Sequence, residues 1–294
     1  MRIIVPFPPG GSTDVLARVF GLRLTARLGP DVIVENRSGG ATVPGTLAGA
    51  KATADGHTLL LASDSSFAIN PHTIKNLPYD ALKDLSPVMI LGVVPNWIVV
   101  NAARPEKTFG ELVEFIRRNP GKATFSVNAP GGQTHLVLEN WKRTSGLDFS
   151  VVPYQGLPPA LIDLLGGRIT ATADLIAGTF EQVRDGKLRA LAIMGEKRAG
   201  TAPEVPAYAE TAGVKGLNAL STFAFFAPGG TPPDRVTRLH RELAAIAEEP
   251  EVTARMRVMG IESLRLTPKE SAEFVRRQYE RFGTIVRETG FQPN

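Results

Sequence analysis

The stretch IIVPFPPGGSTDVLARVF, residues 3–20, decides the fold class of this chain. It opens with an apolar run that Pro8-Pro9-Gly10-Gly11 interrupts, and from Ser12 onward apolar residues recur at the three- and four-residue spacing of a helix. A buried strand that enters a helix through a tight glycine turn is the first half of a βαβ unit. We therefore expect a strand at 2–7, a helix at 12–28 and an α/β fold.

The same alternation continues through the first hundred residues. Short apolar strands are predicted at 32–36 and 58–62, and a helix at about 43–52 separates them. Strands that are apolar on both faces are typical of parallel sheets with helices on both sides. The sequence therefore predicts a doubly wound, mostly parallel sheet flanked by helices.

A second series of elements begins near Asn101. Thr108 to Glu111 has the spacing of a capping box, and the helix that it opens runs to about Arg118. Further helices are predicted at about 134–144 and 158–165, and strands at 124–127, 150–153, 169–173 and 188–194. This segment can therefore build a sheet of its own.

Two long apolar strands divide the chain. One starts at residue 96 and the other at residue 222, and each ends in a proline-containing turn that leads into a helix. We interpret them as two strands that cross between lobes and act as a hinge. On this interpretation residues 1–100 and 224–294 form one lobe, residues 101–223 form the other, and a ligand cleft lies between them.

Composition excludes several classes of function. The chain has no cysteine, so it has neither a thiolate nucleophile nor a sulfur-based zinc site. Its four histidines lack the spacing of a metal pair, and GxSxG is absent, so we predict no metal, no cofactor and no catalytic residue, while a Ser-His-Asp triad from residues distant in sequence stays open. The net charge of +4 is not gathered into a basic block, which disfavours nucleic acid. No apolar stretch approaches the roughly 20 residues of a membrane helix.

Three small polar turns, at 8–14, 36–41 and 63–66, follow the first three predicted strands. The carboxyl ends of parallel strands are where ligands bind in open α/β sheets. A helix amino terminus after the first turn favours an anion, although a plain connection capped by Ser12 is an equal alternative. The candidate ligand-binding residues here are Phe7, Pro8, Gly10, Gly11, Ser12, Ser63 and Ser65.

The other lobe supplies two loops of small and amide-bearing residues. Their candidate ligand-binding residues are Asn128, Ala129, Gly131, Gly132, Gln133, Thr134, Tyr154, Gln155 and Gly156. Asp174 ends a strand and is a candidate acceptor for a ligand hydroxyl or amine, with plain capping as the alternative, and we interpret His135 as structural. Backbone amides with a few polar side chains are the usual means of orienting a small polar or anionic ligand.

Taken together, these motifs resemble the Bug-type solute-binding proteins, the extracytoplasmic receptors of tripartite tricarboxylate transporters. The matching pieces occur in the family's order and cover essentially the whole chain. They are PFPPGGSTDVLAR at 6–18, VENRSGG at 34–40, ADGHTLLLA at 54–62, LPYDALKDLSPV at 77–88, VPYQGLPPALIDLLGG at 152–167, DGKLRALAI at 185–193 and FFAPGGTPP at 225–233.

The resemblance implies a two-lobed periplasmic binding protein fold, type II-like, that closes on a small carboxylate held largely by backbone amides and bridging waters. It implies a monomeric receptor without enzymatic activity, which passes the carboxylate to the membrane components of a transporter. It also implies a periplasmic location, with a signal peptide that has been removed or trimmed from this chain.

The chain departs from the family pattern in its second-lobe loop. Residues 129–133 read APGGQ, where the family commonly has Gly-x-Gly-Thr. This departure bears on the identity of the ligand. Two other functions stay open at this point: an enzyme acting on a small anionic substrate, and a ligand-sensing module for a signalling partner.

Overall fold

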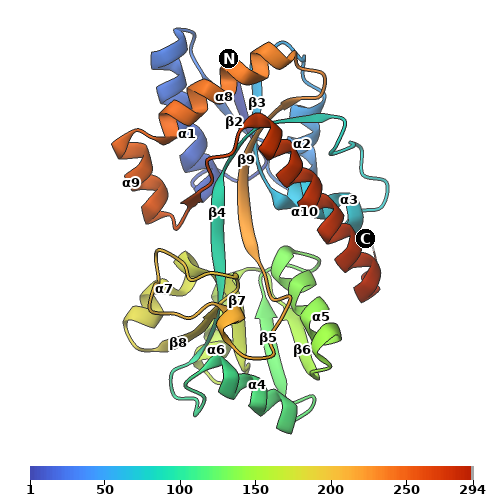
Figure 1. Cartoon of the computed structure of the whole chain (residues 1–294), viewed down its shortest axis with the longest axis vertical. Coiled ribbons are helices and arrows are strands. Elements are labelled where there is room, and N and C mark those ends of the chain that lie inside the picture. Colours follow the sequence, from blue (N-terminus) through green and yellow to red (C-terminus); the bar gives the residue numbers. More distant parts are fainter. Residues whose placement is uncertain (293–294) are drawn as a thin grey trace. The chain divides into compact units, whose positions relative to one another are not determined.

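The computed structural model describes residues 1–292, which form an α/β protein that divides into two compact units (Figure 1). Unit 1 comprises Met1–Val93, Thr222–Thr284 and the segment that begins at Gln292, and unit 2 comprises Val94–Ser221 and Ile285–Phe291. Unit 1 therefore holds the blue start and most of the orange-to-red end of the chain in Figure 1, and unit 2 holds the green and yellow middle. No helix in the described part of the chain is long and apolar enough to cross a membrane.

The sheet of unit 1 is built on three parallel strands in the order β2-β1-β3. They are β1 Arg2–Val5, β2 Ile33–Asn36 and β3 Thr58–Ser63. The sheet continues through β9 Leu220–Pro228, antiparallel to β3, to β4 Leu85–Asn101, and the short β10 Glu262–Ser263 pairs with β4. The chain passes from one unit to the other within β4 and again within β9.

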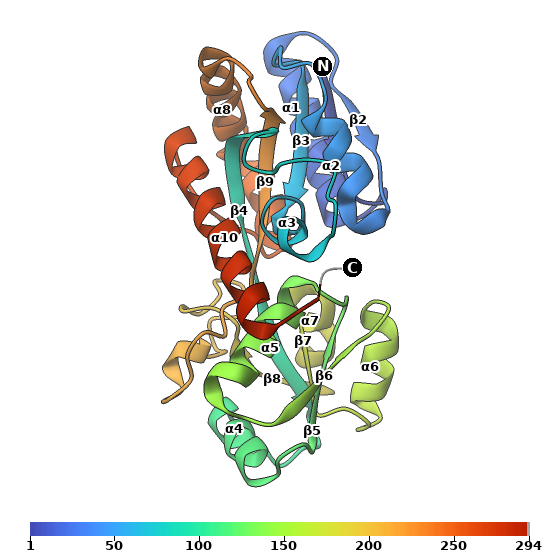
Figure 2. The same cartoon turned by 90° about the vertical axis from the view of Figure 1, so that its right-hand side faces the viewer.

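Helices cover both faces of this sheet. Ile3 pairs with Leu59 and faces Gly21 of α1, whereas the next residue on β3, Leu60, faces Gly49 of α2. Successive side chains of a strand point to opposite faces, so α1 and α2 lie on opposite sides (Figure 2). The helices of this part of the chain are α1 Ser12–Leu28, α2 Val43–Ala50, α3 Asn70–Thr73, α8 Pro233–Ala247, α9 Pro250–Val258 and α10 Pro268–Thr289, of which the residues from Ile285 onward belong to unit 2.

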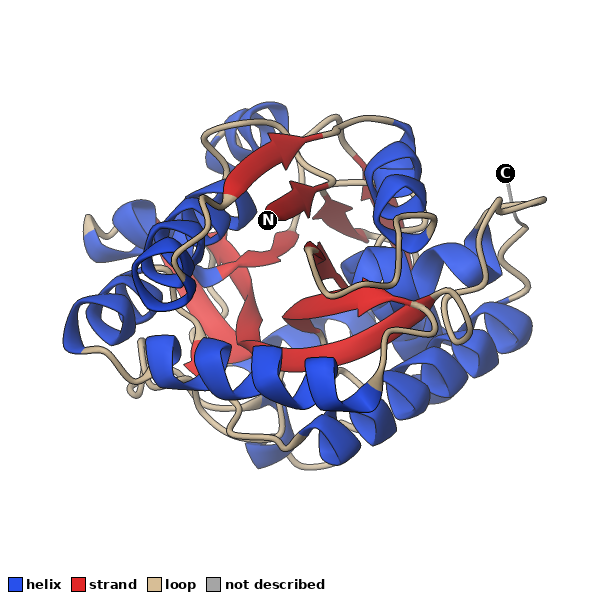
Figure 3. Ribbon diagram, turned by 90° about the horizontal axis from the view of Figure 1, so that it is seen from above, coloured by secondary structure: helices blue, strands red, loops and turns tan. Residues whose placement is uncertain are grey.

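Unit 2 repeats the design with the strand order β6-β5-β7, again parallel. Its own strands are β5 Ala123–Val127, β6 Phe149–Pro153, β7 Ala171–Leu175 and β8 Leu188–Ile193, and the second half of β4 pairs antiparallel with β7 and β8. Its helices are α4 Phe109–Arg118, α5 Gln133–Ser145, α6 Leu157–Leu165 and α7 Ile176–Arg184. Figure 3 shows the strands of both units in red and the helices in blue.

Aromatic packing fixes α4 and α5 on one face of the unit 2 sheet. The ring of Trp141 lies 5.7 Å from Phe109, 6.2 Å from Phe125 and 5.2 Å from Phe149, between ring centroids. All four side chains are buried. Truncating one such side chain typically costs about 3–5 kcal/mol of stability.

The capping box predicted at Thr108 is present in part. The hydroxyl of Thr108 accepts a hydrogen bond from the Glu111 N–H, as a cap should, but the Glu111 carboxylate accepts from the N–H of Lys107, one residue before the cap. The segment after β3 differs more from expectation. It forms a π-helical turn, Ser65–Ile69, followed by α3, and the side chains of Phe67 and Ile69 are buried in the core.

At Gly45, α2 approaches the residue that follows β1 without room for a side chain. A Cβ atom there would lie 2.6 Å from Pro6 Cα and 2.6 Å from Arg37 O, both backbone atoms. We expect Gly45→Ala to destabilise the protein by about 2 kcal/mol, because the backbone must shift to admit the methyl group. The measurement is the urea midpoint of unfolding. Gly110→Ala is the matched control, since its nearest neighbours lie at 3.8 Å, and equal midpoints for the two variants would contradict the argument.

Candidate functional site

The first turn connects β1 to α1 and is held by a buried carboxylate. Asp14 Oδ2 accepts hydrogen bonds from Gly10 N–H at 2.9 Å and from Arg18 Nε at 3.0 Å, and Oδ1 accepts from Asn36 Nδ2 at 2.9 Å. Gly10 has φ +84, the left-handed region that glycine adopts without strain. The N-cap residue is Gly11, and Ser12 is the first helical residue. The alternative that Ser12 caps the helix is therefore wrong.

The pKa of Asp14 follows from these contacts. Burial disfavours its charged form, but the hydrogen bonds from Arg18, from the Gly10 N–H and from Asn36 outweigh burial and lower the pKa of Asp14 below its usual value. Asp14 is therefore ionised at neutral pH. It uses the amide of Gly10 for itself, and this amide is not available to a ligand.

The second turn carries a run of left-handed residues. Gly40, Ala41 and Thr42 have φ of +47, +51 and +74, and for Ala and Thr this conformation costs of order 1–2 kcal/mol each. Buried hydrogen bonds stabilise the run: Asn70 Nδ2 donates to Ala41 O at 2.6 Å, and the hydroxyls of Thr42 and Ser66 lie 3.0 Å apart. A turn was expected at 36–41, but the sequence did not predict this left-handed run, which tertiary contacts fix.

The third turn begins at Ser63, at the end of β3. Next to it the buried Asp64 accepts a hydrogen bond from the Thr222 N–H of β9 at 2.7 Å. Burial raises the pKa of Asp64 to about 6, although this hydrogen bond and the charge of Arg281 oppose the shift. The candidate residues Ser63 and Ser65 flank Asp64, and both are only partly buried.

In unit 2, the loop after β5 leads directly into α5. Its residue Gly131 has φ +67, Gly132 is the N-cap, and Gln133 is the first helical residue. The side chain of Gln133 donates to Leu220 O at 3.0 Å and accepts from Asn96 at 3.3 Å. This side chain is thus bound to the strands β4 and β9.

The loop after β6 is tied to the loop after β5. The N–H of Tyr154 donates to Val127 O at 2.8 Å, and the N–H of Gly156 donates to Asn128 O at 3.4 Å. The Tyr154 hydroxyl donates to Asp163 Oδ2 at 2.8 Å, and this hydrogen bond raises the pKa of Tyr154. The Tyr154 hydroxyl is therefore hydrogen-bonded to α6 through Asp163.

Asp174 lies at the end of β7, beside the loop after β5. Its Oδ1 accepts from Asn128 Nδ2 at 2.5 Å, and burial raises the pKa of its carboxyl group above the usual value. Asp174 Oδ2 and Asn128 Oδ1 are buried and have no hydrogen-bond partner among residues 1–292. A buried acceptor without a partner is costly, so this pair is the strongest polar feature of the loop cluster in unit 2.

The predicted site residues thus fall into two sets, each at the carboxyl edge of three parallel strands. The unit 1 set contains Phe7, Pro8, Gly10, Gly11, Ser12, Ser63 and Ser65. The unit 2 set contains Asn128, Ala129, Gly131, Gly132, Gln133, Thr134, Tyr154, Gln155, Gly156 and Asp174. The residues that hold the turns of the unit 1 set, such as Asp14 and Asn70, were not among the predicted site residues. The sequence offers one indication of the role of Asp14. It lies four residues before Arg18, which is the spacing of an ion pair on a helix.

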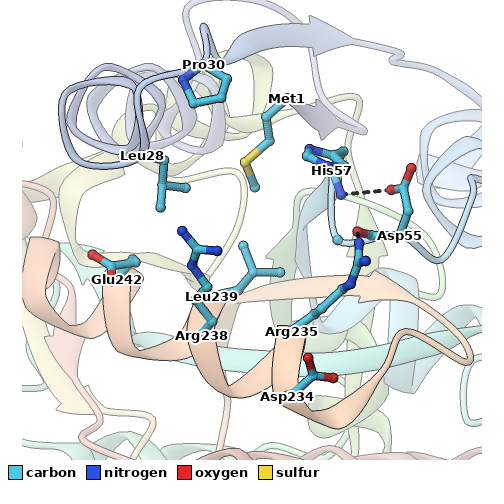
Figure 4. A pocket seen from close by; sticks show the side chains of 11 residues that line it. Met1, Leu28, Pro30, Asp55, His57, Asp234, Arg235, Arg238, Leu239 and Glu242 are labelled. Carbon is cyan, nitrogen blue, oxygen red and sulfur yellow. Dashed lines mark hydrogen bonds between the residues drawn. The ribbon is translucent and has the colours of Figure 1, made fainter.

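A cavity of about 510 Å³ lies at the opposite edge of the unit 1 sheet, where β1 and β3 begin (Figure 4). The N–H of His57 donates to Asp55 Oδ1 at 2.9 Å, and Arg235 of α8 donates to the backbone carbonyl of Asp55. None of the predicted site residues lines this cavity. Its lining residues are Met1, Leu28, Pro30, Asp55, Gly56, His57, Asp234, Arg235, Arg238, Leu239 and Glu242.

Metal-ligating side chains do not gather in the part of the chain that the structure describes. No three His, Cys, Asp or Glu residues there are placed to hold one ion. The groups that the candidate residues offer a ligand are backbone amides, amide and hydroxyl side chains, and the buried carboxyl of Asp174.

Two α/β units joined by crossing strands, with small-residue turns at the carboxyl ends of parallel strands, define a periplasmic binding protein, and the predicted fold class is confirmed. Residues 16–291 match the model of the tripartite tricarboxylate transporter family receptor. Protein BugT of Bordetella pertussis is 38% identical over 291 residues, which cover 99% of this chain and 89% of that protein. The chain belongs to the tripartite tricarboxylate transporter receptor family, as the resemblance of its motifs indicates.

Solved structures agree with this assignment. The structure of Rpa4515 from R. palustris with adipate has a TM-score of 0.82 and 32% identity, covering 100% of this chain and 98% of that one. The structure of MatC from Rhodopseudomonas palustris with bound malate has a TM-score of 0.78 and 26% identity, covering 97% and 98%. The first of these structures contains adipate and the second contains malate, and both molecules are small carboxylates.

Asp64→Asn is expected to remove a pH-dependent loss of stability. The pKa of Asp64 is about 6 in the folded protein and about 4 in an unfolded chain. Its favourable contribution is therefore fully present below pH 4 and is lost as the pH rises through 6. Two pKa units correspond to about 3 kcal/mol. Between pH 4 and pH 7, the free energy of unfolding of the wild type should fall by about that amount relative to Asp64→Asn.

Glu210→Gln is the control of opposite sign for this experiment. The hydrogen-bonded ion pair with Arg198 lowers the pKa of Glu210 to about 2, so its contribution is present above the usual Glu pKa and is lost as the pH falls. Urea unfolding of all three proteins from pH 7 down to pH 3 gives the comparison, because the Glu210 contribution is lost only below its usual pKa of 4.5. If the difference in the free energy of unfolding between wild type and Asp64→Asn stays constant with pH, the prediction is wrong.

Proposed function

We propose that this chain is an extracytoplasmic receptor that captures a small carboxylate and delivers it to a tripartite tricarboxylate-type transporter. The observation that carries the proposal is that both sets of site residues contain glycine turns that lead directly into a helix, α1 in unit 1 and α5 in unit 2. The first N–H groups of a helix lack intrahelical partners, and the helix dipole favours an anion there. The carboxylates held by the two relatives support the same class of ligand.

The candidate set contains no lysine or arginine, so we propose that the ligand charge is neutralised by backbone dipoles. The amides at the start of α1, from Ser12, are the contacts in unit 1, and those at the start of α5 serve unit 2. Dipoles of this kind contribute about 0.3–1 kcal/mol each at exposed sites and more where water is excluded. Such binding is reversible, as release to a transporter requires.

Asp174 and Asn128 set the proposed chemistry at the other end of the ligand. Their buried acceptor atoms favour a ligand that carries a hydroxyl or amino group in addition to its carboxylate, because such a donor satisfies an atom that otherwise has no partner. We propose that one ligand is shared by the two sets, so that binding makes the protein more compact.

We further propose that the protein acts in the periplasm as a monomer and performs no reaction on its ligand. Its partner would be the membrane component of the transporter. A receptor and an enzyme differ in what happens to the bound acid, so recovery of the unchanged acid from the complex distinguishes them.

Thermal unfolding against a panel of mono-, di- and tricarboxylates, hydroxy acids and acidic amino acids tests the proposal. The protein is first unfolded, dialysed and refolded, to remove any ligand that it carries. A ligand at 100 times its dissociation constant adds about 2.7 kcal/mol, which raises the transition by several degrees. We expect such a rise for one chemical class of acid, and the absence of any rise across the panel would count against the receptor.

A further inference from the structure

The segment that follows α10 lies on the candidate loop of unit 2. Helix α10 ends at Thr289, Gly290 turns the chain with φ +67, and the ring of Phe291 meets the ring of His135 edge to face at 5.8 Å between centroids. A Cβ atom built on Gly131 would lie 2.8 Å from Phe291 Cζ. Phe291 therefore touches the backbone of the loop itself, at its left-handed glycine.

His135 contacts both the ring of Phe291 and the backbone of Gly131. Its Nδ1 accepts a hydrogen bond from Gly131 N–H at 2.9 Å, which requires that Nδ1 carry no proton. Burial lowers the pKa of His135, although Glu139, at 3.9 Å from Nε2, acts in the opposite direction. The ring of Phe291 covers the imidazole and so contributes to the burial that keeps it neutral.

Helix α10 holds Phe291 in place. In unit 1 the imidazole of His72 hydrogen-bonds to Tyr279 O at 2.9 Å, and a Cβ atom at Gly283 would lie 2.8 Å from the same imidazole. In unit 2 Glu288 forms an ion pair with Arg143 of α5. The aromatic ring is therefore presented by a packed helix, two residues beyond its end.

The loop depends on such a support, because it has little packing of its own. Ala129 and Pro130 are exposed, and loops with few buried contacts open at low cost. Gly131 can leave the left-handed region freely, since glycine has no conformational preference that would hold it there. If Gly131 changes its backbone conformation, the loop that leads into α5 changes its conformation as well.

We propose that Phe291 is a positioning residue, which holds Gly131 against His135 and so keeps the loop before α5 ready to receive the ligand. The inference rests on the proposed function, because it assigns this loop to ligand binding. Prearranged groups bind more tightly, because less ordering is required on binding. An aromatic contact of this kind corresponds to a factor of about 3 to 10 in an equilibrium constant.

The test compares Phe291→Ala with the wild type by three measurements: affinity for the acid identified in the panel, hydrogen exchange of the loop amides, and NMR titration of His135. We expect affinity to fall about 3- to 10-fold. Exchange should rise at the amides of residues 129, 131 and 132, since Pro130 has no amide hydrogen, and stay unchanged in the core strands. The pKa of His135 should rise toward its usual value as its burial is reduced.

Phe291→Leu is the rescue variant, since it keeps an apolar contact with Gly131 and should lie between the other two proteins in all three measurements. Phe180→Ala is the matched control: this ring lies on α7 of unit 2, is 37% exposed, and should leave the loop unchanged. The inference is overturned if Phe291→Ala behaves like Phe180→Ala, or if exchange rises equally in loop and core.

The design separates the two proposals. If the wild type binds no acid, the proposed function fails, while exchange and the His135 titration still decide whether Phe291 positions the loop. If the wild type binds and Phe291→Ala binds equally well with an unchanged loop, the receptor stands and the inference fails.

Discussion

Parallel pairing of three strands within each unit is the constraint on which the rest of the structure depends. The registers β2-β1-β3 and β6-β5-β7 bring the carboxyl ends of three strands to one edge, so that turns far apart in sequence meet there. Each parallel connection also requires a helix, and the amino end of that helix lies at the same edge. Each turn at the carboxyl end of a strand is therefore followed by the free backbone N–H groups of a helix amino terminus.

Side chains around these edges mainly hold the backbone in place. Asp14 is the clearest case, since a buried and ionised carboxylate serves to fix Gly10 and Asn36. The buried hydroxyl of Ser66 meets those of Thr42 and Thr46 in the same way. A rigid turn presents its amides at low entropic cost, which offsets the weakness of each individual dipole. Binding strength then depends on how firmly the turns are held.

Local patterns predicted what local physics determines. The strand, glycine turn and helix of residues 3–20 are present, as is the hydrogen bond from Glu111 N–H to the Thr108 cap, because spacing and turn chemistry fix them. The sequence could not predict that Gly11 takes the cap position or that Gln133 turns toward β4 and β9. Nor could it place Phe291 beside Gly131, 160 positions earlier in the chain. These features depend on tertiary contacts between distant segments.

Asp174 and Gly178 illustrate how such a contact restricts the sequence. A Cβ atom at position 178 would lie 2.1 Å from Asp174 Oδ2, so the carboxylate and any side chain on α7 at this point compete for one space. A shorter residue at 174 would remove this conflict, but Leu157 Cδ2, at 3.0 Å from the same Cβ position, would still crowd a side chain at 178. The carboxylate at 174 and the absence of a side chain at 178 are therefore coupled, because a side chain at 178 requires either Asp174 or the first turn of α7 to move.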